Sequence, residues 1–224
     1  MKFKKKAAIE DVLEAVKEDG MALHFVPEPL RTEALCLEAV KQNGLALRFV
    51  PLALRTEAVC LAALAHGRVA DYAPATAYVP ARLLEESGAV RDAAVRHCGM
   101  VLRHVPEALR TPDLCLVAVR QNGLALRWVP ENMKTPEICA DAVCSSGWAV
   151  KHVPADLLTE DLCLVAARDA GAEALELMPH EMVTRRICGA AAARDGIDPE
   201  TVWQDVCEWR DAVLIQGGRH ENQG

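Results

Sequence analysis

The sequence has few aromatic residues, no long apolar run and no excess of positive charge. Phe, Trp and Tyr make up only 4% of its 224 residues, which is low for a core built from a few large layers. No run approaches the ~20 apolar residues that a membrane-spanning helix needs, so we expect no membrane segment. The net charge of -7 makes a general nucleic-acid binder an unfavoured class.

Short motifs for catalysis or ligand binding are also lacking. The sequence has no Gly-rich phosphate loop, no nucleophile elbow, no paired metal-ligand histidines and no Cys-x-x-Cys, and its closest cysteines, Cys139 and Cys144, lie five positions apart. The basic start leads into Glu10 and Asp11 rather than an apolar stretch, so we expect no signal peptide. Nine cysteines in such a chain favour free thiols and a cytoplasmic protein. We therefore expect no catalytic residue, cofactor or metal ion.

An internal repeat of about 24 residues dominates what is present. A proline follows most of the repeating glycines by seven positions, and a cysteine follows by sixteen or seventeen. The glycines are Gly20, Gly44, Gly67, Gly99, Gly123, Gly147, Gly171 and Gly196, and the cysteines are Cys36, Cys60, Cys115, Cys139, Cys163 and Cys188.

Each repeat is predicted to hold two helices, a short one and a longer one. The longer helix begins after a threonine whose hydroxyl can accept a hydrogen bond from an orphan N–H. In the repeat that starts at Thr32, apolar residues follow at helical spacing, and the helix ends at Asn43-Gly44, where glycine can take positive φ. The threonines are Thr32, Thr56, Thr111, Thr135, Thr159 and Thr184.

The shorter segment, for example residues 45–50, is closed by a proline. It is compatible with one or two turns of α-helix or with a 3₁₀ helix. Because Leu45, Leu47 and Phe49 alternate with other residues, a strand is the competing interpretation, and it would imply a leucine-rich-repeat-like unit. The ladder asparagine of that pattern is absent, so we expect a helix.

The predicted fold class is all-α: an α-solenoid of helix-turn-helix repeats with a C-terminal capping helix. One repeat cannot bury enough apolar surface to offset its lost chain entropy, so neighbours must stack. We expect a single array over 1–216 and a flexible tail over 217–224. The predicted repeats lie near 9–19, 20–43, 44–66, 67–98, 99–122, 123–146, 147–170 and 171–195, with an insertion at 75–86, Ser87 as the irregular cap, and the capping helix at 199–215.

Two segments carry a resemblance to a known family. Residues 40–50 (Val-Lys-Gln-Asn-Gly-Leu-Ala-Leu-Arg-Phe-Val) and 119–129 (Val-Arg-Gln-Asn-Gly-Leu-Ala-Leu-Arg-Trp-Val) resemble a family of uncharacterised bacterial and protist repeats. That family has no assigned activity, so the resemblance implies architecture and little function. The repeat length is also similar to that of leucine-rich-variant repeats, which alternate α and 3₁₀ helices. Some of those proteins hold an iron–sulfur cluster on clustered cysteines, a pattern that this chain lacks.

The cysteine column invites a metal or cluster interpretation. Neighbouring helices lie ~8–10 Å apart, and a disulfide needs Cα atoms within about 7 Å, so one cysteine per repeat cannot pair along a stack. We expect these cysteines to be small core residues. Cys98, Cys144 and Cys207 lie outside the column and are expected to be more exposed; a redox or metal protein that uses them is the third alternative.

Flat rings and basic residues also recur at fixed positions. The rings pack at the edge of the short-helix layer or line a groove as partner anchors; they are Phe25, Phe49, Tyr72, His104, Trp128 and His152. One basic column lies on the short helix, and comprises Arg48, Arg103, Arg127 and Lys151. A second precedes the long-helix cap, and comprises Arg31, Arg55, Arg110 and Lys134.

Two interpretations of the basic columns stay open. They are solvated faces with weak ion pairs to Glu28, Glu107 and Glu131, or they form a surface for a partner. The candidate partner-binding residues are the short-helix basic column and the rings. The favoured function is a non-enzymatic protein-interaction scaffold whose partner is a protein or peptide, an acidic peptide being one candidate. The alternative is a nucleic-acid-binding solenoid that uses the same arginines, although the acidic net charge weighs against it.

Overall fold

The computed structural model describes residues 12–66 and 75–208, and within these ranges it is all-α with no strand. The α-helices are α2 (Glu33–Gln42), α3 (Glu57–His66), α4 (Ala81–Glu86), α5 (Gly88–His97), α6 (Pro112–Gln121), α7 (Pro136–Ser145), α8 (Glu160–Ala170) and α9 (Arg185–Asp195). Residues 12–18 and 199–208 are also helical. The described part of the predicted capping helix is therefore confirmed; residues 209–215 and the predicted tail lie outside the described residues.

The short segment of each repeat is a 3₁₀ helix, which excludes the strand interpretation for the described repeats. These helices are η1 (Gly20–Phe25), η3 (Gly44–Phe49), η5 (Ala75–Tyr78), η6 (Gly99–His104), η8 (Gly123–Trp128), η10 (Gly147–His152) and η11 (Gly171–Leu177). The alternation of α and 3₁₀ helices is the one that the second resemblance implies.

A second, three-residue 3₁₀ turn follows the proline in most repeats and was not predicted. These turns are η2 (Glu28–Leu30), η4 (Leu52–Leu54), η7 (Glu107–Leu109), η9 (Glu131–Met133) and η12 (His180–Met182). Proline precedes each of them because its fixed φ leads into the turn and its missing N–H leaves no donor unsatisfied. The turn returns the chain to the start of the long helix.

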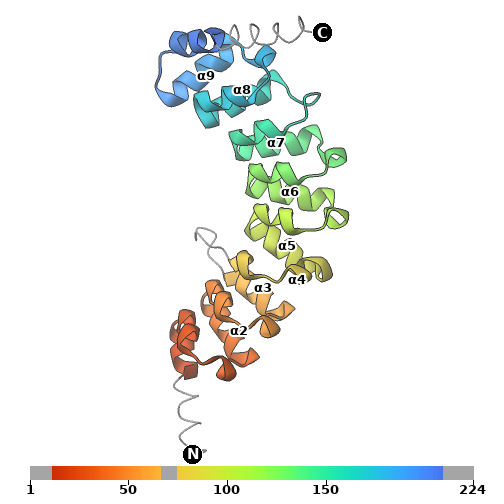
Figure 1. The fold of residues 1–224 in the computed structure, drawn as a ribbon, viewed down its shortest axis with the longest axis vertical. Helices are drawn as coiled ribbons and strands as arrows, with labels where there is room; N and C mark the ends of the chain where they lie inside the picture. The colour runs from red at the N-terminus through yellow and green to blue at the C-terminus, as the bar shows by residue number, and fades with distance from the viewer. Residues whose placement is uncertain (1–11, 67–74, 209–224) are drawn as a thin grey trace, which may run out of the picture. The chain divides into compact units, whose positions relative to one another are not determined.

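The described residues fall into two compact units, 1–117 and 118–224, with the boundary inside α6. In the N-terminal unit, α2 packs on α3 and α3 on α5, while η1 packs on η3 and η3 on η5. In the C-terminal unit, α7 packs on α8 and α8 on α9, while η8 packs on η10 and η10 on η11. Each unit therefore has a layer of α-helices beside a layer of 3₁₀ helices (Figure 1). A single array across both units stays a prediction.

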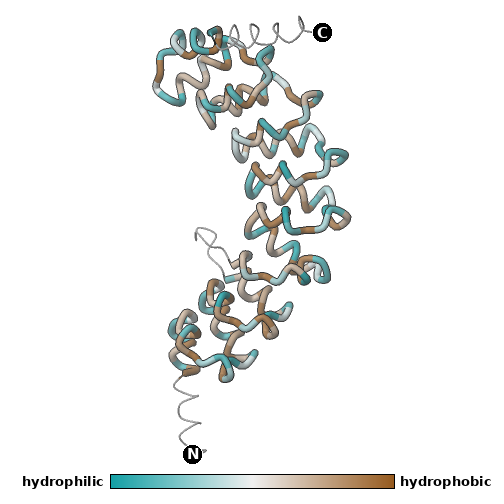
Figure 2. Tube along the Cα trace, in the orientation of Figure 1, coloured by the Kyte–Doolittle hydropathy of each residue, from teal (hydrophilic) through white to brown (hydrophobic). Residues whose placement is uncertain are grey.

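Hydrophobic and hydrophilic segments alternate along every repeat (Figure 2). The buried positions of the α-helices repeat: α2 buries Leu35, Cys36, Ala39 and Val40, and α7 buries the equivalent Ile138, Cys139, Ala142 and Val143. None of the helices within the described residues has the length and apolar character that crossing a membrane requires.

The predicted caps of the long helices are confirmed. The hydroxyl of each cap residue accepts a hydrogen bond from the backbone N–H three positions later, at 3.2–3.4 Å. The cap of one repeat also contacts the previous repeat: Thr56 donates to Glu33 at 2.9 Å and Ser87 donates to Glu57 at 2.9 Å. Each of these two glutamates is the first residue of its helix, so the caps link neighbouring repeats.

The prediction that the Asn-Gly glycine takes positive φ is wrong for Gly44. Among the described residues, only Gly171 and Gly196 have positive φ. Asn43 is instead the N-cap of η3, and its side-chain oxygen accepts a hydrogen bond from the N–H of Leu45 at 3.0 Å.

The glycine column is explained by close packing of the backbone. A Cβ built on Gly20 or Gly123 would collide with the backbone carbonyl of Ala39 or Ala142 in the following α-helix. A Cβ on Gly147 would lie 2.7 Å from the carbonyl oxygen of Ala166. Glycine thus lets the 3₁₀ helix approach the next long helix directly.

The register predicted for the irregular repeat is wrong. Val79-Pro80 closes η5 as Val50-Pro51 closes η3, so Tyr78 takes the ring position and Pro80 the proline position. Pro74 and Tyr72, which were aligned there, lie outside the described residues. Residues 75–86 form η5 and α4, so they are not simply an inserted loop.

Replacing Gly123 by Ala should destabilise the protein by about 1–3 kcal/mol, because the added methyl group must displace the backbone of α7. The matched control is Gly189→Ala, since Gly189 lies inside α9 and a Cβ there would meet nothing within 4 Å. This control should gain about 0.5–1 kcal/mol from helix propensity. Urea unfolding of both variants measures the difference, and equal stabilities would contradict the close-packing explanation.

Candidate functional site

The two basic columns have different environments. The short-helix column (Arg48, Arg103, Arg127 and Lys151) is exposed, whereas the residues of the second column are partly buried. The side chain of Lys134, for example, is only 7% exposed. The sequence places only the short-helix column among the candidate partner-binding residues, and the structure gives the second column a different environment.

The second column binds backbone carbonyls at the ends of the 3₁₀ helices; we call Arg31, Arg55, Arg110 and Lys134 the bridging residues. Arg31 donates from Nε to the carbonyl of Val26 at 2.8 Å, at the end of η1. Its NH1 group donates to the carbonyl of Phe49 at 2.6 Å, at the end of η3 in the next repeat. The guanidinium therefore joins the ends of two consecutive 3₁₀ helices.

Contacts of the same kind recur in the repeats that carry Arg55, Arg110 or Lys134. Arg55 donates to Val50 at 2.9 Å and to Tyr78 at 2.8 Å, which joins η3 to η5. Arg110 donates to Val105 at 2.9 Å, at the end of η6. Lys134 donates to the carbonyl of His152 at 3.0 Å and pairs with Glu131 at 2.7 Å.

The expected ion pair forms between Lys134 and Glu131, but among the described residues no carboxylate pairs with Arg31 or Arg55. The second column is neither a solvated face nor a free surface for a partner. The last carbonyls of a short helix have no intrahelical donor, and a cation at that end satisfies them and interacts favourably with the helix dipole. These residues have a structural role.

The exposed basic residues lack such contacts. Among residues 12–66 and 75–208, no carboxylate lies within ion-pair distance of Arg48, Arg103, Arg127 or Lys151. Some other cations of the described chain are paired, for example Arg120 with Asp141 at 2.6 Å and Arg185 with Glu200 at 2.9 Å. The column is thus positive surface without a counter-charge in the described structure.

The C-terminal unit concentrates this charge around His152. Burial lowers the pKa of His152, and the positive charges of Lys151, Arg127 and Lys134 lower it further. Three cations from η8, η10 and the loop before α7 therefore lie close enough to act on one ring. These charges disfavour the protonated imidazole, because a fourth positive charge would be repelled.

The ring column is divided between packing and exposure. Phe49, Trp128 and His152 are half-buried, His104 is exposed, and Phe25 is 84% exposed. The ring of Phe49 lies 4.7 Å from that of His24, and the guanidinium of Arg48 lies 5.0 Å above it. Arg127 lies in the same way 5.2 Å from the ring of Trp128. The basic and aromatic columns thus form pairs on the same 3₁₀ helices.

The cysteine column is confirmed as core. All nine cysteines are free, the six column members are buried, Cys144 is exposed, and Cys98 and Cys207 are intermediate. Burial raises the pKa of the Cys60 and Cys115 thiols to about 11. Within the described part of the chain, no group of three His, Cys, Asp or Glu residues is placed to hold a metal ion.

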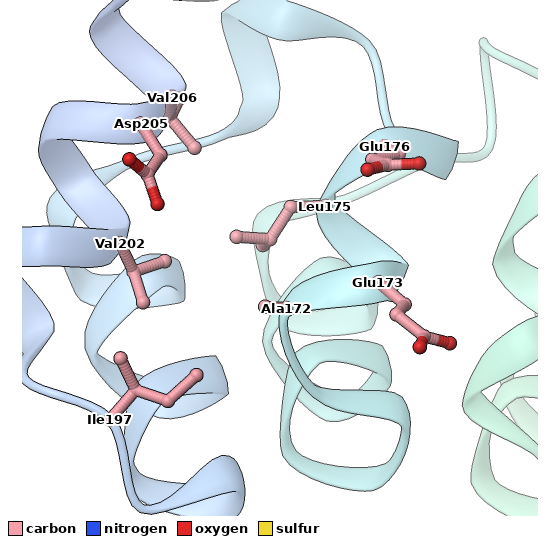
Figure 3. A pocket seen from close by; sticks show the side chains of 8 residues that line it. All are labelled: Ala172, Glu173, Leu175, Glu176, Ile197, Val202, Asp205 and Val206. Carbon is pink, nitrogen blue, oxygen red and sulfur yellow. The ribbon is translucent and has the colours of Figure 1, made fainter.

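A cavity of about 350 Å³ lies in the C-terminal unit between η11 and the helical residues 199–208. Leu175 and Val202 point into it from opposite sides, and Asp205 points toward it, while Glu173 and Glu176 point away (Figure 3). Its lining contains no cation and no nucleophile, so we assign no chemistry to it.

The comparisons with known proteins agree with a repeated domain. Residues 9–55 and 92–134 each match a family model described as Domain of unknown function (DUF4116). The chain resembles a repeated, uncharacterised domain. The comparisons with curated proteins and with solved structures find no match.

Sequence analysis missed the role of the bridging residues. A signal was available, because each precedes the long-helix cap directly and lies a fixed distance beyond the short helix. The residue type alone could not reveal it, since arginine serves solvated surfaces and buried carbonyls equally well.

Replacing Arg55 by Met should destabilise the protein by roughly 1.5–3 kcal/mol, the range for hydrogen bonds made by a charged group. Arg55→Lys should restore part of this loss, because Lys134 makes the equivalent contact. The control is Arg48→Met, an exposed residue whose replacement should change stability by about 0.5 kcal/mol or less. Thermal and urea unfolding measure all three; equal losses for Arg55→Met and Arg48→Met would contradict the bridging role.

The cysteines should differ strongly in reactivity. Cys144 should be alkylated rapidly by iodoacetamide in the native protein, because it is exposed. Cys60 and Cys115 should react only on unfolding, since they are buried and each unit of raised pKa lowers the thiolate fraction about tenfold. Mass spectrometry of timed, quenched samples identifies the labelled sites. Native labelling of Cys60 at the rate of Cys144 would show that the column is not core.

Proposed function

We propose that the protein is a non-enzymatic scaffold that binds another protein through the exposed basic residues of its 3₁₀ helices. The observation that carries the proposal is the separation of the two basic columns. The bridging residues donate hydrogen bonds to backbone carbonyls. The short-helix column is exposed and has no carboxylate partner among the described residues. Repeats present such side chains at regular intervals, which suits an extended partner.

An acidic partner fits this surface best. Arg127 and Lys151 lie on consecutive 3₁₀ helices that pack on one another, and both act on His152. The neighbouring ring of Trp128 adds a flat half-buried surface. Two neighbouring cations beside an aromatic ring favour a partner segment that carries carboxylates. Both Arg and Trp are enriched in binding hot spots.

The proposal places the protein in a reducing compartment such as the cytoplasm. Its nine cysteines are all free, and six of them are buried in the core as thiols. Free thiols in this number favour a compartment in which disulfides are rare.

The test is a charge reversal in the C-terminal unit. Immobilised protein is used to isolate partners from an extract of its native source, and each candidate is then purified and titrated directly. The double variant Arg127→Glu, Lys151→Glu should weaken binding of the purified partner at least tenfold, because like charges then face each other. Its melting temperature should match that of the wild type, since both residues are exposed.

The control is Arg168→Glu, an exposed residue of α8 outside the column, which should bind as the wild type does. Full binding by the double variant would remove the exposed basic residues from the proposal. Capture that disappears after nuclease treatment, and weakens steeply with salt, would favour the nucleic-acid alternative instead.

A further inference from the structure

A groove of about 640 Å³ lies in the N-terminal unit between η5, α4 and η6. Most of its lining is apolar, with Val79, Leu84, Met100 and Val101 among the larger side chains. Its volume is within the range of sites that enclose a small molecule or a few peptide residues.

The groove exists because the regular stacking of the 3₁₀ helices is interrupted. η1 packs on η3 and η3 on η5, but η5 and η6 do not pack closely on one another. The α-helix layer continues without a break, since α3 packs on α5. The opening is therefore confined to the 3₁₀ layer.

Two differences in sequence coincide at this place. The residue before the cap Ser87 is Glu86, where the neighbouring repeats have the bridging residues Arg55 and Arg110. In addition, the three-residue turn of the other repeats is replaced by the six-residue helix α4. The missing cation alone is not sufficient, because Leu158 occupies the same position in a later repeat where η10 and η11 still pack.

A cation lies at this groove without a counter-charge. Arg103 and His104 both line it, and Nε of Arg103 donates a hydrogen bond to Nε2 of His104 at 2.7 Å. Burial lowers the pKa of His104, and the positive charge of Arg103 lowers it further, so the ring accepts this hydrogen bond in its neutral form. No acidic residue lines the groove.

The arrangement leaves the terminal nitrogens of Arg103 available. Within residues 12–66 and 75–208, the side chain of Arg103 makes a single hydrogen bond, to His104. That bond holds Nε and leaves NH1 and NH2, a pair of parallel donors that matches the two oxygens of a carboxylate. A phosphate dianion is matched less well, because one guanidinium supplies the only positive charge in a largely apolar lining.

We propose that the η5–η6 groove binds an acidic peptide segment of a partner protein. Arg103 pairs with the carboxylate of a Glu or Asp residue, and the apolar walls receive an aliphatic side chain next to it. The inference rests on the proposed function, because it assigns to the scaffold a specific pocket in addition to its exposed basic surface.

The test is a selection from a random heptapeptide phage library on the immobilised full-length protein. We expect enrichment of sequences with Glu or Asp beside Leu, Ile, Val or Met. A synthetic consensus peptide should bind Arg103→Gln at least tenfold more weakly than the wild type, and its Glu→Gln counterpart should lose a similar factor. The matched control is Arg48→Gln, the equivalent residue of η3, which does not line the groove and should bind normally.

Cys98 reports where the peptide binds, because it lines the groove and is partly exposed. Saturating peptide should slow alkylation of Cys98 at least fivefold and leave that of Cys144 unchanged. Ala77→Trp, which fills the groove from an exposed position on η5, should abolish binding while the protein keeps its melting temperature.

The inference is overturned by an absence of enrichment, by a consensus without an acidic residue, by unchanged binding to Arg103→Gln, or by unprotected Cys98. It is also overturned if a peptide with phosphoserine in place of Glu binds more tightly. These outcomes leave the proposed function standing if reversal of Arg127 and Lys151 still weakens partner binding. If the groove tests fail and reversal of Arg127 and Lys151 also leaves partner binding unchanged, both the inference and the proposed function are overturned.

Discussion

The hydrogen bonds from one repeat's cation to the backbone carbonyls of two 3₁₀ helices are the constraint on which the rest of the structure depends. A six-residue 3₁₀ helix has poor hydrogen-bond geometry and unsatisfied carbonyls at its end, so it has little stability alone. Arg31 and Arg55 satisfy these carbonyls in their own repeat and in the next one. Where the cation is present, the end of a short helix is thereby completed by a neighbouring repeat, which favours the occurrence of the motif in series. The three-residue turn after the proline has the matching role of bringing the cation back to the helix end.

Small residues set the distance at which these bonds form. The glycine that begins a 3₁₀ helix lies against a carbonyl of the following α-helix, and the buried cysteine and alanine of that helix occupy little volume. A larger residue at either place would hold the two layers apart. The repetition of Gly and Cys in the sequence therefore expresses one packing requirement at two positions.

The parts of the fold that depend on local chemistry could be predicted from the sequence. Threonine caps, helical spacing after Thr32 and buried column cysteines are all read from nearest neighbours, and the structure confirms them. Features that depend on the next repeat could not be predicted in the same way. Gly44 is expected to take positive φ because glycine often ends helices, whereas in the structure its φ is not positive and it begins η3 as a buried residue. The irregular repeat was aligned on Gly67 and Pro74, whereas the contact between Arg55 and Tyr78 fixes the register at Pro80.

In the candidate site too, what depends on local sequence could be predicted and what depends on the next repeat could not. Arg48, Arg103, Arg127 and Lys151 could be proposed from the sequence as partner-binding residues. The role of Arg31 and Arg55 could not, because it depends on what each side chain reaches in the next repeat. Once the bridging residues are assigned to the scaffold, the remaining cations are those whose charge the described structure does not use. The repeat that follows the one with Glu86 at the bridging position carries Arg103 beside an open groove. Sites where a chain departs from its own structural rule are where function is expected, since stability alone does not require the departure. Glu86 and the six-residue helix α4 are such departures, and both coincide with the groove between η5 and η6.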